Sequence, residues 1–155
     1  MKVLILGADG MIGHKMAQSL SHFDLYLNSR SKSNYLQEYF PSSTLSNFDF
    51  LNQNIEDLLE KTLPDYIINA VGITIRRGAS YNQETNFLNS QLPKKIDFWC
   101  KENQKKQIHF STDCVFSGDK GNYNDLDLPD AKDEYGSSKG KGEINSNNTL
   151  TIRSS

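Results

Sequence analysis

The stretch Lys2-Val3-Leu4-Ile5-Leu6-Gly7-Ala8-Asp9-Gly10-Met11-Ile12-Gly13 opens the chain and decides its fold. Its first part is an apolar run, which is typical of a parallel strand buried on both faces. Three glycines follow directly, and apolar residues then recur at helical spacing as far as residue 20. A strand, a glycine turn and a helix in this order are the context that a dinucleotide-binding motif requires.

Each glycine has its own expected role in such a motif. Gly7 permits a tight turn, Gly10 lets the backbone approach a pyrophosphate, and Gly13 lets the helix pack close to the sheet. Unpaired amides at the start of the helix would then face the phosphates. The alternative is that these glycines only make a turn, and the sequence leaves it open.

The rest of the chain alternates predicted strands with predicted helices. Strands are expected over residues 24–28, 44–48, 66–70, 107–111 and 149–153. Helices are expected over residues 33–40, 55–62 and 87–102, and again from residue 135. This alternation predicts a Rossmann-type, doubly wound parallel sheet in a three-layer α/β/α arrangement. We find no repeat and no linker, so residues 1–155 are expected to form a single NAD(P)-binding domain.

Composition excludes several classes of partner. The net charge is −2 and no long basic run occurs, so nucleic acid is not an expected partner. No apolar stretch is long enough for a membrane span, and the N-terminus enters a strand directly, which predicts a cytoplasmic protein without membrane contact. Cys100 and Cys114 have neither a metal-ligand spacing nor a disulfide framework, so no metal site is expected.

The residues after the second predicted strand bear on the choice of cofactor. Ligands of such sheets bind outside the carboxyl ends of the strands, where an acid would take the ribose hydroxyls of NAD. This strand instead ends in Asn28-Ser29-Arg30-Ser31-Lys32, which has two cations and no acid. Arg30 offers charge-assisted hydrogen bonds to a 2′-phosphate, which favours NADPH and leaves NADH open. An ordinary solvated arginine is the alternative.

Asp49 and Phe50 follow the third predicted strand and have two interpretations. The pair would lie beside the adenine, with the Asp49 carboxylate accepting a hydrogen bond from the adenine amino group. An aspartate that precedes a helix is equally well explained as a cap. The sequence does not decide between these two roles.

A second pattern, Tyr135-x-x-x-Lys139, predicts acid chemistry. Residues four apart on a helix share one face, and a free phenol has a pKa of about 10, which is too weakly acidic for efficient proton donation near neutrality. We therefore expect the Lys139 ammonium to lower the pKa of Tyr135 and to hold the nicotinamide ribose. Thr112 follows the strand over residues 107–111, where its hydroxyl would donate to a substrate carbonyl, or simply cap a turn.

Taken together, these motifs resemble the dTDP-4-dehydrorhamnose reductase family of extended short-chain dehydrogenase/reductases. The resemblance rests on residues 7–13, on Ser111-Thr112-Asp113-Cys114-Val115-Phe116-Ser117-Gly118, on Pro129 and on residues 135–143. It implies NADPH-dependent reduction of a 4-keto group on a nucleotide-linked deoxysugar, in the synthesis of surface polysaccharide precursors. The catalytic residues that it implies are Thr112, Tyr135 and Lys139. The cofactor contacts that it implies are Gly10, Met11, Ile12, Asp49, Phe50, Gly72, Ile73 and Thr74, together with Tyr135 and Lys139.

Two positions depart from that family and point to a different sugar. Cys114 stands where the family often has tyrosine, so a ring contact near the substrate would be missing. Ile73 precedes Arg76-Arg77 in a loop that often carries histidine. These arginines would meet a sugar-nucleotide pyrophosphate, or are ordinary exposed loop cations.

The chain also ends early relative to that family, whose members continue well beyond residue 155. The substrate domain is therefore expected to be absent, with NADPH binding retained and turnover feeble. The exposed apolar surface that this would leave allows a homo-oligomer.

Two other functions stay open. One is a non-catalytic NADP-binding regulatory module that grips an enzyme partner. The other is a nucleotide-sugar epimerase or dehydratase, which would retain NAD instead of consuming NADPH.

Two further residues have structural alternatives. Asn89 would order a water near the site or be a solvated or capping residue, and His109 is expected to be packed rather than catalytic.

Overall fold

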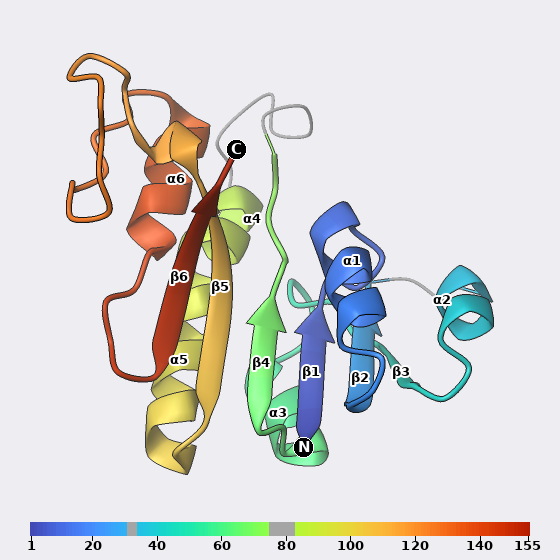
Figure 1. Ribbon diagram of the computed structural model, residues 1–155. Coiled ribbons are helices and arrows are strands. Elements are labelled where there is room, and N and C mark those ends of the chain that lie inside the picture. Colours follow the sequence, from blue (N-terminus) through green and yellow to red (C-terminus); the bar gives the residue numbers. More distant parts are fainter. Residues whose placement is uncertain (31–33, 75–82) are drawn as a thin grey trace.

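A single parallel sheet runs through the computed structural model, which describes residues 1–30, 34–74 and 83–155 (Figure 1). Its strands are β1 (Lys2–Leu6), β2 (Asp24–Ser29), β3 (Thr44–Asn47), β4 (Tyr66–Asn69), β5 (Lys106–Thr112) and β6 (Thr149–Ser154). The strand order is β3-β2-β1-β4-β5-β6, and every neighbouring pair is parallel. The order reverses between β1 and β4, which is the switch point where such sheets bind ligands. The predicted Rossmann-type fold is confirmed.

Helices cover both faces of this sheet (Figure 1). On one face lie α1 (Met11–Ser19) and α2 (Asn34–Tyr39), and on the other lie α3 (Ile55–Thr62), α4 (Gln83–Asn86), α5 (Leu92–Asn103) and α6 (Glu134–Gly142). A short 3-10 helix, η2 (Asp113–Val115), follows β5. None of these helices in the described part of the chain has the length and apolar character that a membrane crossing needs.

The helix predicted over residues 87–102 differs from the structure in its start. It begins at Gln83 and contains a π-helical turn, η1 (Phe87–Gln91), in which the Leu92 amide donates to the Phe87 carbonyl. Pro93 lies near the start of α5 and has no N–H to donate to the carbonyl of Asn89, four residues earlier. The missing bond accounts for the wider turn at this point, a feature that often occurs at functional sites.

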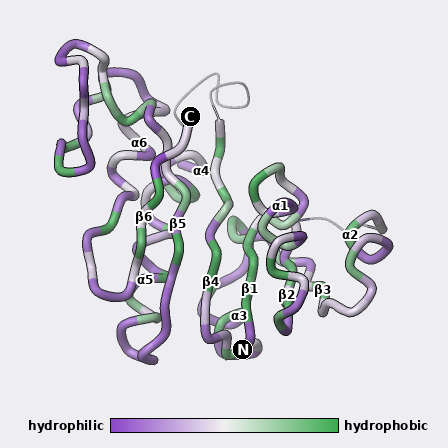
Figure 2. The backbone as a smooth tube through the Cα atoms, viewed as in Figure 1, coloured by the Kyte–Doolittle hydropathy of each residue, from purple (hydrophilic) through white to green (hydrophobic). Residues whose placement is uncertain are grey.

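Alternating residues of the central strands form the two halves of the core. Leu4 and Leu6 of β1 pack with α3 and α5, whereas Val3 and Ile5 pack with α1 and α2. Figure 2 shows the hydrophobic residues concentrated along β1 and β4, in the middle of the sheet. This pattern on both faces explains why the strands read as continuous apolar runs in the sequence.

Apolar residues on the outer strands are less well covered. Ile68, Ile108 and Leu150 are aligned across β4, β5 and β6 and therefore point to the same face. Ile68 is buried, but Leu150 is 59% exposed. Such an exposed face suits association with another surface, and the homo-oligomer stays a prediction.

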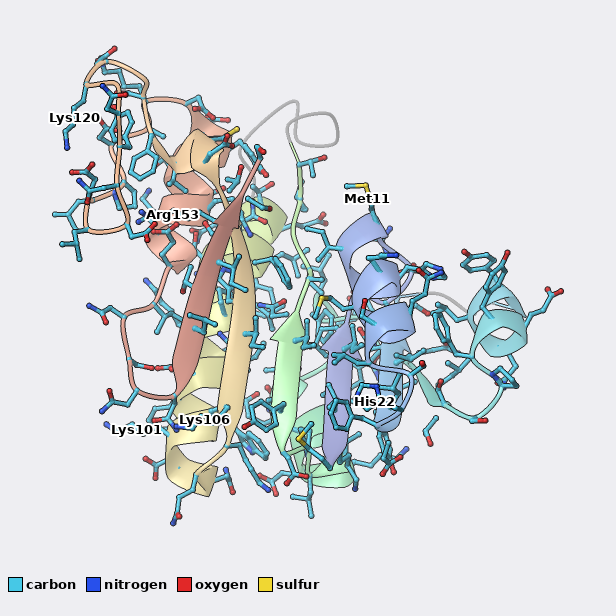
Figure 3. The ribbon with its side chains drawn as sticks, viewed as in Figure 1. Met11, His22, Lys101, Lys106, Lys120 and Arg153 are labelled. Atoms are coloured by element: carbon cyan, nitrogen blue, oxygen red, sulfur yellow. The ribbon has the colours of Figure 1, made fainter. Side chains whose placement is uncertain are left out.

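A partly buried ion pair joins the end of the sheet to the end of α6. Arg153 of β6 donates from Nε and Nη2 to the two carboxylate oxygens of Glu143, at 2.9 and 2.7 Å. Ser111 donates to the same carboxylate at 2.8 Å. The Arg153 guanidinium also lies 4.7 Å from the centre of the Phe116 ring, and Figure 3 shows Arg153 beside the lower end of the long loop that carries Lys120. These contacts fix the end of β5, and with it Thr112, against α6, which carries Tyr135 and Lys139.

Candidate active site

The glycine turn has the predicted geometry. Gly7 has a φ of +74°, a backbone conformation that favours glycine. The Gly10 amide donates to the Gly7 carbonyl at 3.0 Å, and a Cβ on Gly13 would lie only 2.2 Å from that same oxygen. α1 then begins at Met11 without a side-chain cap on its first turn. Amides at an uncapped helix start suit an anionic ligand, which agrees with the predicted roles of Met11 and Ile12.

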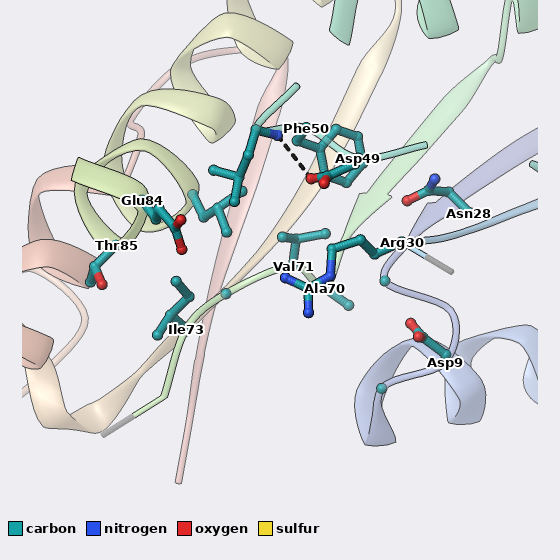
Figure 4. Close-up of a pocket in the computed structure, with 15 residues that line it drawn as sticks. Asp9, Asn28, Arg30, Asp49, Phe50, Ala70, Val71, Ile73, Glu84 and Thr85 are labelled. Atoms are coloured by element: carbon teal, nitrogen blue, oxygen red, sulfur yellow. Dashed lines mark hydrogen bonds between the residues drawn. The ribbon is translucent and has the colours of Figure 1, made fainter. Parts of the chain in front are cut away.

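A cavity of about 530 Å³ lies beside this turn at the carboxyl edge of the sheet (Figure 4). Its size is in the range of small-molecule and cofactor sites. Seven of the predicted cofactor residues line it, namely Gly7, Gly10, Arg30, Asp49, Phe50, Gly72 and Ile73. Met11, Ile12, Gly13 and Thr74 are not among the lining residues. The structure therefore brings together residues from four separate strand ends.

Two charged residues of the cavity have distinct settings. The Arg30 side chain reaches across the cavity toward Ala70 and Val71 (Figure 4). The Asp49 carboxylate accepts from the Leu51 amide at 3.1 Å and from Asn52 Nδ2 at 2.8 Å. Asp49 therefore closes a turn ahead of α3 and borders the cavity, but it is not the helix cap that the alternative interpretation predicts, because α3 begins at Ile55 with Asn54 as its N-cap.

The sequence interpretation missed the lining residues that lie on the helix ahead of α5. Glu84 and Thr85 belong to α4 and Leu88 to the π-helical turn, and all three border the cavity. The predicted helix began at residue 87, four residues too late to place α4 beside the cavity. The residues Gln83-Glu84-Thr85 carried the only available signal, a polar run ahead of an apolar helix.

Thr112 and Tyr135 meet at the carboxyl end of β5. Thr112 Oγ1 accepts from the Cys114 amide at 3.2 Å, so this hydroxyl caps η2, as one of its two predicted roles requires. Burial raises the pKa of Tyr135 above its ordinary value of 10.0, and a hydrogen bond with the Thr112 side chain opposes that shift. The pair that the sequence proposed as acid and carbonyl-binding hydroxyl is therefore together in the fold.

The predicted effect of Lys139 on Tyr135 is wrong. The pKa of Tyr135 is raised, because burial outweighs the influences that favour the phenolate. Lys139 is only 5% exposed, and its Nζ donates to the Phe110 carbonyl at 2.7 Å. Burial also lowers the pKa of Lys139 to about 8. Val71, Gly72 and Ile73 follow β4 and line the cavity, and we call them the cavity loop. The Lys139 ammonium lies beside this loop, since a Cβ on Gly72 would be 3.6 Å from Nζ.

Asn89 ties the cavity loop to α6. Its Oδ1 accepts from the Ile73 amide at 2.8 Å, and its Nδ2 donates to the Ile73 carbonyl and to Ser138 Oγ, both at 3.0 Å. Asn89 is fully buried, so the interpretation as a solvated residue is wrong. It holds the loop against the residue that precedes Lys139, and its predicted role in ordering a water stays a prediction.

The remaining predicted site residues have mixed outcomes. Cys114 is exposed and lies near Tyr135. Burial is the main cause of the raised pKa of Tyr135, and Cys114 contributes to it in the same direction. Arg76 and Arg77, which were assigned to a sugar-nucleotide pyrophosphate, lie outside the described residues. Across residues 1–30, 34–74 and 83–155, no cluster of three or more metal-binding side chains occurs.

The buried Lys139 gives a pH-dependent contribution to stability. Its pKa falls from 10.5 in the unfolded chain to about 8 in the fold. Between these values the unfolded chain binds more protons, so this residue's contribution to stability rises as the pH increases. Relative to Lys139→Met, the wild type should gain roughly 3 kcal/mol of unfolding free energy from about pH 7 to about pH 10.5. Urea denaturation of both proteins measures this difference, and parallel pH dependences would contradict it.

A model of a known family matches almost the whole chain. The family is described as the RmlD substrate binding domain, and the match covers residues 1–153. A curated relative is the probable low-salt glycan biosynthesis reductase Agl14 of Haloferax volcanii. It is 28% identical over 146 residues, which cover 92% of this chain and 48% of the relative.

Solved structures give the same picture of the fold. A hypothetical dTDP-4-dehydrorhamnose reductase from Sulfolobus tokodaii aligns with a TM-score of 0.85 and 30% identity, over 99% of this chain and 55% of the other. A UDP-glucuronic acid 4-epimerase from Bacillus cereus, in complex with UDP-glucuronic acid and NAD, aligns with a TM-score of 0.76 and 23% identity. That alignment covers 92% of this chain and 50% of the epimerase. The chain thus spans about half the length of the relatives it matches.

Proposed function

This chain belongs to the family of the RmlD substrate binding domain, and on this basis we propose that it is an NADPH-dependent reductase of a nucleotide-linked 4-ketosugar. The observation that carries the proposal is that the predicted catalytic residues and the cavity lie at the same edge of the sheet. Thr112, Tyr135 and Lys139 lie at the end of β5 and on α6, and Lys139 borders the same loop as the cavity beside the glycine turn.

The cavity has the features that a dinucleotide requires. Gly7 and Gly10 offer a close backbone approach, and the uncapped start of α1 offers amides to a pyrophosphate. Arg30 offers charge-assisted hydrogen bonds to a 2′-phosphate from within the cavity. When bound, the reduced nicotinamide supplies a hydride to the substrate carbonyl carbon.

Side chains of this chain supply the proton and stabilise the negative charge that develops on the substrate oxygen. Tyr135, which is protonated at neutral pH, donates its phenolic proton to the substrate oxygen; burial makes this phenol a weaker acid, and the hydrogen bond with Thr112 opposes that effect. The Thr112 hydroxyl donates a hydrogen bond to the same oxygen as negative charge develops there. The Lys139 ammonium, held by the Phe110 carbonyl beside the loop that carries Gly72, would hold the nicotinamide ribose.

The sugar class comes from the resemblance to the reductases of Sulfolobus tokodaii and Haloferax volcanii. Because this chain spans about half of each, the substrate, the cytoplasmic location and any homo-oligomer are proposals. A suitable test supplies dTDP-4-dehydrorhamnose and follows the oxidation of NADPH. Binding of NADPH with slow, enzyme-dependent oxidation supports the proposal, and a chain that binds no dinucleotide contradicts it.

Arg30 gives a separate test of cofactor choice. In Arg30→Ala, the affinity for NADPH should fall by about 10- to 100-fold, because a charged hydrogen bond to phosphate is lost. The affinity for NADH should stay near the wild-type value. Fluorescence titration with each dinucleotide measures this, and Lys101→Ala, an exposed cation at the opposite end of the sheet (Figure 3), is the matched control. An equal loss for both dinucleotides would contradict the assignment of Arg30.

A further inference from the structure

A buried polar pair lies beneath the cavity loop, where the proposed reaction assigns no role. His109 of β5 and Asn69 of β4 are aligned in the sheet, and both are 0% exposed. Asn69 Nδ2 lies 3.3 Å from His109 Nδ1. A buried polar pair costs free energy unless its members are hydrogen-bonded, so the direction of this contact is informative.

The hydrogen bond from the Val71 amide fixes the orientation of the Asn69 side chain, and with it the direction of the hydrogen bond between Asn69 and His109. The Val71 N–H lies 3.1 Å from Asn69 Oδ1 and can act only as a donor, so the Asn69 oxygen must face it. The Asn69 amide nitrogen therefore faces His109 and donates. His109 Nδ1 must then be the unprotonated acceptor, and the ring proton must reside on Nε2.

The surroundings of His109 keep its ring neutral. Burial lowers the pKa of His109 to about 3, and the nearby Lys139 charge acts in the same direction. A protonated ring would place two donors, Nδ1–H and the Asn69 amide, against each other. The accepting form of Nδ1 is therefore maintained across the physiological pH range.

We infer that His109 is a positioning residue of the cavity: its Nδ1 holds Asn69 in the one orientation that anchors the Val71 amide. Val71, Gly72 and Ile73 line the cavity, and Asn89 holds Ile73 at the other end. The loop is thus fixed at both ends by buried amides. The inference rests on the proposed function only where it states that this loop is pre-organised for a dinucleotide.

Two substitutions of His109 separate this role from simple packing. An asparagine places an oxygen near the position of Nδ1, whereas a glutamine places its amide near Nε2. In His109→Asn, the Val71 amide should keep its protection from hydrogen exchange, and the NADPH affinity should stay near wild type. In His109→Gln, exchange at Val71 should be at least about 10-fold faster and NADPH binding roughly 10-fold weaker. Equal behaviour of the two variants, in either direction, would overturn the inference.

A measurement on the wild type keeps the inference testable if either variant fails to fold. Nitrogen NMR of the unliganded chain should show His109 with its proton on Nε2, and a proton on Nδ1 would overturn the inference. The exchange and tautomer results need no ligand, so they decide the role of His109 by themselves. If they hold while the wild type binds no dinucleotide, the proposed function fails and the anchoring of the loop stands.

Discussion

Substituting Gly13 with alanine should destabilise the fold by about 3 kcal/mol or more, because the new Cβ would overlap the backbone of the glycine turn. It would lie 2.2 Å from the Gly7 oxygen, 2.8 Å from the Gly7 carbonyl carbon and 2.9 Å from the Ala8 Cα. All three are backbone atoms of the turn between β1 and α1, so no side chain can rotate to relieve the contact. α1 must then move away from the sheet.

Gly10→Ala is the matched control for Gly13→Ala. A Cβ on Gly10 would lie 3.3 Å from the Gly7 oxygen, which is tight but tolerable. Gly10→Ala should therefore keep most of the unfolding free energy and lose dinucleotide affinity, because its Cβ occupies space that the pyrophosphate needs. Urea denaturation and fluorescence titration measure the two effects. A Gly13→Ala protein as stable as Gly10→Ala would contradict the packing role of Gly13.

Local patterns were enough to predict the sheet. Every strand of the structure begins and ends within one residue of its predicted range. The reason is physical: a parallel sheet covered on both faces needs apolar runs, and β1 and β4 carry them without interruption. The glycine turn was predictable for a similar reason, because Gly7, Gly10 and Gly13 each meet a constraint of the backbone itself.

Features that depend on burial were not predictable. The sign of the Tyr135 pKa shift follows from how deeply the phenol is covered, which spacing along α6 does not reveal. The role of Asn89 depends on a π-helical turn that ordinary helical periodicity does not signal. The link between Asn69 and His109 joins residues 40 positions apart, which only the strand register brings together.

Tyr135→Phe should abolish reduction and leave NADPH binding intact. The substitution removes the proton donor and little else, so the rate should fall by about 10²- to 10⁴-fold. Tyr66→Phe, at the opposite end of β4, is the matched control, because it removes the same hydroxyl far from the site. NADPH oxidation with dTDP-4-dehydrorhamnose and NADPH titration together measure the result. A wild type that binds NADPH but reduces neither this substrate nor other nucleotide-linked 4-ketosugars would favour the regulatory module.

The pH dependence of the wild-type rate separates the contribution of Lys139 from that of the proton donor Tyr135. Tyr135 must be protonated to act, and its raised pKa means that this form persists to pH values above about 10. Lys139, with a pKa of about 8, loses its charge first as the pH rises. A decline in rate that begins near pH 8 should therefore report Lys139, and it should be absent from the residual rate of Lys139→Met. A decline that persists unchanged in Lys139→Met would contradict the assignment of that pKa to the lysine.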